Sequence, residues 1–286
     1  MFAVDRSERG KLAITGPEAK EFLQALVTND VEALTPGHGC YAAVLTPKGK
    51  MLGDLRVLDL GDELLLDCER VALQPIFNVL WRGRLGHEIE IHKRTLELGL
   101  ISLVGVQLAG PNEHDNARTE LAGRPVLAVT TDLGSDLFCA AEDTEAVLAE
   151  LPPGDEADLE LLRVESGRPR YGIDLDDSVI PQEAGLNERA VSFTKGCYVG
   201  QETVARLHYR GKPNRRLRGL RLSRPVEPGA ELRLGEKVVG RLGSVAVSPR
   251  HGPIALAIVR REAEPGDVLS VAGATAELMD LPFSRE

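Results

Sequence analysis

The residues best suited to chemistry lie in one short stretch, Lys-Gly-Cys-Tyr-Val-Gly-Gln-Glu at positions 195–202. Cys197 is a nucleophile only as its thiolate, and the nearby ammonium group of Lys195 favours that form by lowering the thiol pKa. Gly196 and Gly200 allow the backbone to turn sharply or to approach a ligand closely. The stretch therefore predicts a reactive thiol on a tight loop, and a structural turn around a buried thiol is the alternative that the same residues allow.

Two carboxylates occupy positions that suit hydrogen bonding to a ligand. Asp54 follows Gly53 in an apolar extended run, and Glu165 stands at the end of an apolar helical pattern. A carboxylate in an apolar pocket accepts two hydrogen bonds at once, which suits a ring with adjacent N–H donors. Composition alone predicts instead that both carboxylates lie on the surface.

A basic segment follows the cysteine stretch. Residues 203–226 contain eight basic residues and no acidic one, in a chain whose formal net charge is −10. Such a segment could receive a polycarboxylate tail, a phosphate or an RNA backbone. It could equally be a solvated face that balances residues 142–160, which contain eight acidic residues and no basic one. Tyr209 is its only aromatic residue, so a platform for base stacking is not supported.

Several common classes of site are absent from the sequence. It has no Walker-type phosphate loop, no Gly-x-Ser-x-Gly motif and no Cys-x-x-Cys pair. The four cysteines are too scattered to suggest a disulfide scaffold or a metal site: Cys40, Cys68, Cys139 and Cys197. No apolar run reaches the roughly 18 residues of a membrane span, and no signal peptide is visible. We therefore expect a soluble cytoplasmic protein with reduced thiols, whose acidic charge argues against a general nucleic-acid coat.

The elements that must position these residues follow from periodicity and turn signals. The first segment predicts strands at 11–15, 41–45, 51–58, 63–68 and 87–92, and helices over about 16–28 and 70–82. The next predicts strands at 100–108, 125–130 and 136–141, and a helix at 145–151. A helix over 159–167, a loop-rich segment over 168–194 and a helix-compatible run over 203–207 follow. From about residue 217 short strands alternate with turns, which is typical of a small antiparallel barrel or sandwich.

These elements predict an α+β protein with more than one domain. We expect an N-terminal α+β module over residues 1–95, completed by residues 160–210, and a related middle module over 96–155. Residues 156–212 are expected to form a linker helix and the segment around Cys197. Residues 213–286 are expected to form the C-terminal barrel.

Residues 193–206 resemble the Lys-Gly-Cys-Tyr-x-Gly-Gln-Glu motif of the YgfZ family of folate-binding proteins, which are paralogues of the glycine-cleavage T-protein, an aminomethyltransferase. The motif is long and specific. Other segments resemble the family in the same order along the chain: 22–31, 48–58, 162–167 (with Ser166 where alanine is usual) and 181–186.

The resemblance implies a ring of three domains around a central channel that binds tetrahydrofolate or a derivative. It implies that Glu165 holds the pterin ring, that Asp54 assists folate chemistry and that Cys197 is the reactive thiol. No metal ligands are implied. Further folate-binding residues are expected in the motif itself: Lys195, Gly196, Tyr198, Gln201, Glu202 and Arg206.

Three features separate this chain from the T-proteins. Gly53 stands where they carry a second aspartate, residues 129–136 do not match their Gly-Tyr-Thr-Gly-Glu-type loop, and they lack the cysteine at position 197. The resemblance therefore favours an accessory factor for iron–sulfur cluster assembly or repair, which supports tRNA modification indirectly and has iron–sulfur client or assembly proteins as partners. A folate-dependent aminomethyltransferase and a tRNA-binding module are the alternatives, although we do not expect direct binding of nucleic acid or membranes. Whether the protein is an enzyme is left open.

Overall fold

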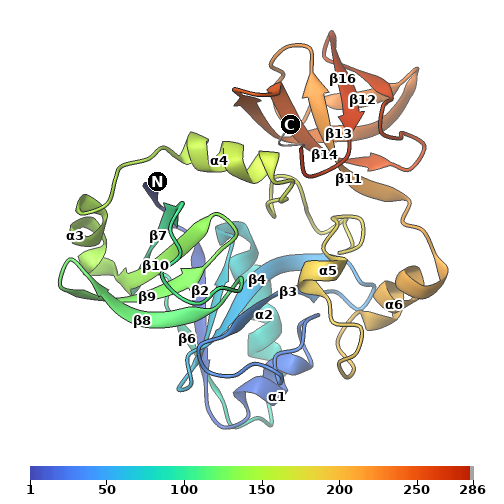
Figure 1. The fold of residues 1–286 in the computed structure, drawn as a ribbon. Helices are drawn as coiled ribbons and strands as arrows, with labels where there is room; N and C mark the ends of the chain where they lie inside the picture. The colour runs from blue at the N-terminus through green and yellow to red at the C-terminus, as the bar shows by residue number, and fades with distance from the viewer. Residues whose placement is uncertain (284–286) are drawn as a thin grey trace. The chain divides into compact units, whose positions relative to one another are not determined.

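The computed structural model describes residues 1–283 and has a mixed α/β fold. The chain forms two compact units, shown with their element labels in Figure 1. The first contains Met1–Glu156 and Glu188–Gln201, and the second contains Ala157–Asn187 and the chain from Glu202 onward. The first unit is thus completed by a segment that returns from later in the sequence.

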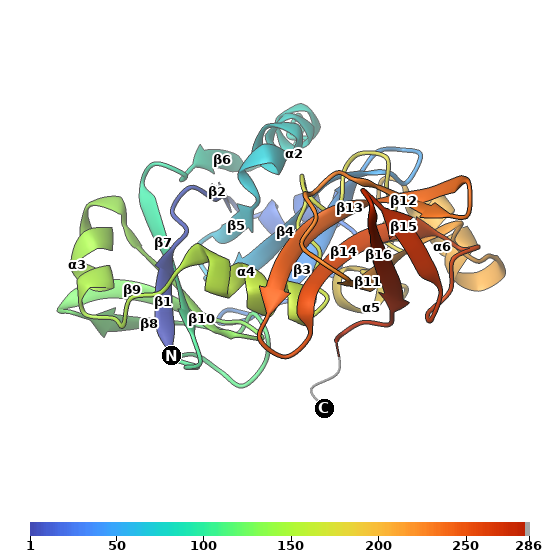
Figure 2. The same ribbon diagram turned by 90° about the horizontal axis from the view of Figure 1, so that it is seen from above.

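One antiparallel sheet of the first unit has helix α2 (Arg70–Gly83) on one face (Figure 2). The helix is amphipathic, and its buried residues Ala72, Ile76 and Leu80 recur every four positions, so they lie along one stripe. The strand order of the sheet is β3 (Gly39–Leu45), β4 (Met51–Asp59), β5 (Leu64–Cys68), β2 (Gly10–Thr15) and β6 (Glu90–Lys93).

A second antiparallel sheet packs against the first. A shared cluster joins them, with Leu58 and Leu65 from one sheet and Leu100, Val129 and Phe138 from the other. The other face of the second sheet packs against α3 (Thr144–Ala149), which contributes Val147 to a separate buried apolar cluster. The strand order is β1 (Phe2–Asp5), β7 (Leu98–Val104), β10 (Gly134–Ala140), β9 (Arg124–Thr130) and β8 (Asn116–Leu121).

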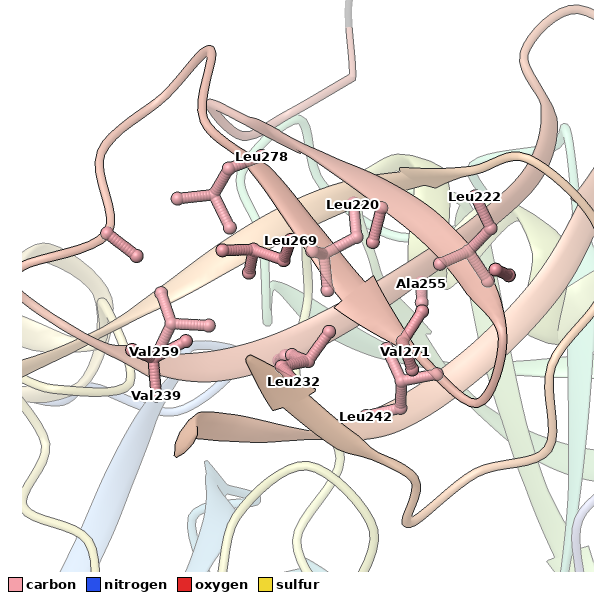
Figure 3. Packing of buried hydrophobic residues seen from close by; sticks show 14 residues of the cluster. Leu220, Leu222, Leu232, Val239, Leu242, Ala255, Val259, Leu269, Val271 and Leu278 are labelled. Carbon is pink, nitrogen blue, oxygen red and sulfur yellow. The ribbon is translucent and has the colours of Figure 1, made fainter. Parts of the chain in front are cut away.

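The second unit is a closed six-stranded antiparallel barrel with α4 (Glu156–Glu165) packed on its outside. Aliphatic side chains fill the barrel interior, among them Leu220, Leu232 and Leu269 (Figure 3). Val164 of α4 packs against Ile254 on the outer surface. Closure pairs every strand and leaves no exposed edge. The strand order is β11 (Arg215–Leu222), β14 (Gly252–Arg260), β13 (Lys237–Ser248), β12 (Glu231–Leu234), β15 (Val268–Val271) and β16 (Ala274–Met279).

Short helices complete the chain. They are α1 (Ala19–Gln24), a 3-10 turn at Ala141–Asp143, α5 (Asn187–Ala190) and α6 (Gln201–Arg210). Across residues 1–283, no helix combines the length and apolarity that crossing a membrane would require.

The strongest periodic signals are confirmed, including the helix over 70–82, the hairpin over 41–58 and the barrel. Some element ends were wrong. The strand expected at 87–92 begins only at Glu90, because residues 84–88 form a turn and a bend, and the strand expected over 100–108 ends at Val104. Strands β1 and β8 and helix α5 were not predicted. β8 is a mostly exposed polar edge strand, which leaves no alternating pattern to recognise.

Candidate functional site

Asp54 lies on β4 between the two sheets of the first unit. Side chains alternate along a strand, so Asp54, Arg56 and Leu58 point toward the second sheet. The hydroxyl of Tyr41, on β3, donates a hydrogen bond of 2.7 Å to Asp54 Oδ2. Asp54 is only 6% exposed, and burial raises its pKa to about 6 against the opposing effect of the Tyr41 hydrogen bond. This carboxyl can therefore exchange a proton close to neutral pH.

Gly53 faces the other way. A Cβ at this position would lie 2.7 Å from Ala72 Cβ and 2.9 Å from Ile76 Cδ1, both on α2. With this backbone, a second carboxylate at position 53 would point into α2 and away from Asp54. Its absence leaves the surroundings of Asp54 unchanged, so Gly53 does not by itself argue against aminomethyl transfer.

His114, in the loop before β8, lies near Tyr41, the hydrogen-bond partner of Asp54, and was not predicted from the sequence. Its ring centroid is 6.5 Å from that of Tyr41, and its backbone is left-handed, with φ of 73°. Within the described chain, its buried Nδ1 atom has no hydrogen-bond partner. Burial lowers the His114 pKa to about 4, so the imidazole is neutral at neutral pH. A neutral imidazole with an unpaired nitrogen can donate to or accept from a ligand.

Arg189 and Glu113 complete the polar surroundings of Tyr41. The Arg189 guanidinium lies 5.1 Å from the centroid of the Tyr41 ring and forms an ion pair of 2.7 Å with Glu113. Nearby Asp132 has its pKa raised to about 6, chiefly by burial and then by the charge of Glu113. The site thus combines two carboxyls that titrate near neutrality with a cation and a neutral imidazole.

An ion cluster lies between the sheets beside Asp54. Arg56 Nε donates to Asp67 Oδ2 at 2.7 Å, and Arg56 Nη1 lies 2.6 Å from Asp136 Oδ2 on β10. Arg9 also donates to Asp67, at 2.9 Å and 3.1 Å. Arg56 therefore links a carboxylate of its own sheet to a carboxylate of the facing sheet.

The returning segment is attached to the first unit through Thr28. The Thr28 hydroxyl donates to the carbonyl of Ala190 at 2.5 Å and accepts from the N–H of Ala43 at 2.8 Å. The N–H of Ser192 donates to the Thr28 carbonyl at 3.0 Å. One side chain thus connects the returning segment to β3, the strand that carries Tyr41.

Lys195 is fixed by the main chain. Its ammonium group donates to the carbonyls of Gln24, Val27 and Asn29 at 2.6, 2.7 and 2.8 Å. A cation is favourable here because these carbonyls belong to the last residue of α1 and to the residues just after it, at the negative end of the helix dipole. Burial lowers the pKa of Lys195 to about 8, so the side chain remains mostly charged at neutral pH. All three of its donors are used, so in this structure Lys195 holds the loop rather than offering a donor to a ligand.

Cys197 is exposed at the apex of this loop, whereas Cys68 and Cys139 are buried and Cys40 is intermediate. The loop is anchored on both sides of the thiol. Lys195 Nζ lies 5.2 Å from the centroid of the buried Tyr198 ring, and the N–H of Val199 donates to the Ala25 carbonyl at 3.3 Å. Burial raises the pKa of Tyr198 to about 12. The expected tight loop is present, and its thiol is not buried.

Replacing Gly200 with alanine is expected to destabilise the protein by about 2–4 kcal/mol. Gly200 has φ of 85°, and a Cβ there would lie 2.5 Å from the Thr46 carbonyl oxygen. Gly196→Ala is the matched control, because a Cβ at Gly196 meets no atom within 4 Å. Urea unfolding should show a change of about 1 kcal/mol or less for the control. Equal effects of the two variants would contradict this account of the anchored loop.

The remaining predicted residues belong to the second unit, except Gln201, which begins α6. Glu165 ends α4, and its Oε1 accepts a hydrogen bond of 2.6 Å from the Ser248 hydroxyl. The N–H of Phe283 donates to the Glu165 carbonyl at 3.0 Å. Glu202 and Arg206 lie on α6 with exposed side chains. Glu165 is therefore held against the barrel, with its second carboxylate oxygen outside this hydrogen bond.

Comparison with known proteins supports the T-protein resemblance at the level of the fold. Residues 2–112 match the family model of the GCVT N-terminal domain. A chloroplast protein of Arabidopsis thaliana, described as a candidate transferase, is 29% identical over 264 residues, which cover 84% of this chain and 61% of that relative. The chain thus spans about three fifths of the length of this relative.

The structural comparison extends over nearly the whole chain. The crystal structure of the glycine cleavage system aminomethyltransferase T from Bartonella henselae matches with a TM-score of 0.85 at 20% sequence identity. The match covers 99% of this chain and 86% of that protein. The chain therefore has a T-protein-like fold. No group of three or more potential metal-binding side chains occurs within residues 1–283.

Proposed function

We propose that this protein binds a reduced folate and acts as an accessory factor in the assembly or repair of iron–sulfur clusters, as the YgfZ resemblance implies. The observation that carries the proposal is the buried carboxyl of Asp54. It lies within the segment that matches the GCVT N-terminal domain, and its pKa of about 6 suits proton exchange with a bound heterocycle. The ring of three domains and the folate channel remain predictions of the resemblance.

The residues around Asp54 fit a folate in chemical terms. A pterin ring presents N–H donors and nitrogen acceptors, which a carboxyl of variable protonation and a neutral imidazole can both satisfy. Asp54 would hold or release a proton, and His114 would offer its unpaired Nδ1 atom. Bound tetrahydrofolate would supply nitrogen atoms that carry a one-carbon unit. Glu165 is a separate candidate for holding the pterin, through carboxylate oxygens of which one already accepts from Ser248.

Cys197 provides the second half of the proposal. Its thiol is exposed on a loop that is anchored on both sides, so a partner protein can reach it without rearranging the loop. A single cysteine is too few to hold an iron–sulfur cluster, which normally takes about four protein ligands. The arrangement therefore suits transient contact with a sulfur species or with a partner's cluster.

The Cys197→Ala variant is expected to bind folate normally but to lose its role in iron–sulfur cluster assembly or repair. Calorimetric titration with tetrahydrofolate should show binding to wild type and to Cys197→Ala, and loss of binding in Glu165→Gln. In cells, Cys197→Ala should leave a client iron–sulfur enzyme as inactive as in a strain without the protein, while the control Cys40→Ala, at a half-buried thiol, should restore it.

Two outcomes would overturn the proposal. Failure of wild type to bind any reduced folate would remove folate from the mechanism. Full activity of the client enzyme in cells that carry Cys197→Ala would remove the Cys197 thiol from the mechanism.

Aminomethyl transfer is the second candidate function, and the surroundings of Gly53 support it. A side chain at position 53 would point into α2 and away from Asp54, and the fold matches that of an aminomethyltransferase. Incubation with tetrahydrofolate and an aminomethylated lipoyl carrier protein decides between the two. If wild type turns over these substrates and Asp54→Asn does not, the protein is an aminomethyltransferase rather than an accessory factor.

A further inference from the structure

A hollow of about 450 Å³ lies on the barrel of the second unit. Its lining is strongly basic, and it draws on both the basic segment and the end of β14. The basic side chains that line it are Lys212, Arg216, Arg218, Arg260 and Arg261. In a chain with a formal net charge of −10, this is a marked local concentration of positive charge.

These cations have few acidic partners. Arg218 Nη1 lies 3.1 Å from Asp280 Oδ1, but its buried Nε atom has no hydrogen-bond partner within residues 1–283. The other four basic side chains form no ion pair with any carboxylate of the described chain. The hollow thus presents positive charge and one buried donor that the protein itself does not satisfy.

The barrel topology creates this arrangement. Strands β11 and β14 are antiparallel neighbours, and their register places Arg216 opposite Val259, both of which line the hollow. The next pair is Arg215 opposite Arg260, of which only Arg260 lines the hollow. The N–H of Arg261 donates to the Asn214 carbonyl at 2.9 Å, which continues the pairing beyond the strand. Like charges on facing strands destabilise a sheet. Glu183 compensates Arg215 with hydrogen bonds of 3.1 and 2.8 Å. Arg260 has no such hydrogen bond from a described acid, although its charge helps to lower the pKa of Glu262, which is itself paired with Lys237.

We propose that this hollow binds a ligand with adjacent phosphate groups. Arginine guanidinium groups form paired hydrogen bonds with phosphate oxygens, and a phosphate carries up to two negative charges on one compact group. Separate carboxylates carry one charge each, so they neutralise clustered cations less completely. Glu264 also lines the hollow, and its negative charge lowers the affinity for any anion. The proposal does not depend on folate binding.

Calorimetry with tripolyphosphate at physiological salt tests the site on the full-length protein. Arg216→Gln is expected to weaken binding about tenfold, and Glu264→Gln to tighten it about threefold. Arg221→Gln is the matched control, because Arg221 lies on the same strand, pairs with Glu277 at 3.5 Å and does not line the hollow. Its affinity should stay within about twofold of wild type.

A second calorimetric titration, with a short single-stranded RNA, distinguishes a nucleic-acid ligand from a small phosphorylated molecule. If the RNA binds and responds to the same variants, the natural ligand is a nucleic-acid backbone. If only tripolyphosphate does so, the natural ligand is a small phosphorylated molecule. Either result supports a phosphate site. Three results would overturn it: no binding of either probe, equal weakening by Arg221→Gln and Arg216→Gln, or tighter binding of tri-γ-glutamate than of tripolyphosphate.

Discussion

Replacing Arg56 with methionine is expected to lower the free energy of unfolding by about 3–5 kcal/mol. Arg56 is 8% exposed and lies between the carboxylates of Asp67 and Asp136, which belong to different sheets. Methionine fills similar space but leaves Asp136 without its guanidinium and Asp67 with Arg9 alone. Removing one partner of a buried ion pair strands a charge in a medium that solvates it poorly. Urea unfolding at pH 7 measures the loss.

The pH dependence follows from the same contacts. Arg56 and Arg9 hold the pKa of Asp67 well below its usual range, against the opposing effect of burial. A lowered pKa stabilises the folded state above the unfolded value of about 3.9, and this stabilisation is lost as the pH falls further. The difference between wild type and Arg56→Met should therefore narrow below about pH 4.

Arg118→Met is the matched control for this variant. Arg118 pairs with Asp62 at 3.3 Å, but both side chains are largely exposed. An exposed pair contributes little because water screens it, so the control should change stability by about 0.5 kcal/mol or less. Equal losses in the two variants would show that Arg56 does not act through its buried partners.

The sequence predicts which residues of β4 share a face but not what covers that face. Asp54 and Arg56 alternate with apolar residues, a pattern typical of a strand with one solvated side. In the structure both side chains are buried between two sheets. The second sheet is built from distant strands, and no local pattern reports that it covers these charges. The expectation from composition that Asp54 lies on the surface was therefore wrong.

The motif around Cys197 was also predictable only in part: the sequence indicates the loop but not the contacts of its side chains. Its glycines and its thiol predict a tight loop, and Gly200 indeed requires a left-handed backbone. The direction of the Lys195 side chain could not be predicted, because a long flexible side chain reaches whichever acceptors the fold provides. Those acceptors are carbonyls near the end of α1, far away in the sequence. His114 carries no sequence signal at all, since a histidine in a polar loop is ordinary.

Asp54→Asn is expected to stabilise the protein while weakening folate binding at least tenfold. The variant keeps the shape of the side chain and an oxygen that accepts the Tyr41 hydroxyl, but it cannot ionise. Burial raises the pKa of Asp54 to about 6, so burial of the ionised form destabilises the folded state at neutral pH. A shift from about 3.9 to that value corresponds to about 2–3 kcal/mol, which the variant should gain at pH 7.

The sign of the pH dependence identifies the cause of this gain. Between about pH 4 and pH 6 the folded protein retains a proton on Asp54 that the unfolded chain has lost, so wild type gains stability as the pH falls through this range. The advantage of Asp54→Asn should therefore be largest above pH 6 and vanish near pH 4. Asp59→Asn, on the same strand, should instead destabilise at pH 7, because Lys20 loses the negative charge that lies 2.6 Å from its ammonium group. If Asp54→Asn instead lowers the free energy of unfolding, or raises it by the same amount at every pH, then burial of the ionised Asp54 carboxylate does not destabilise the folded protein.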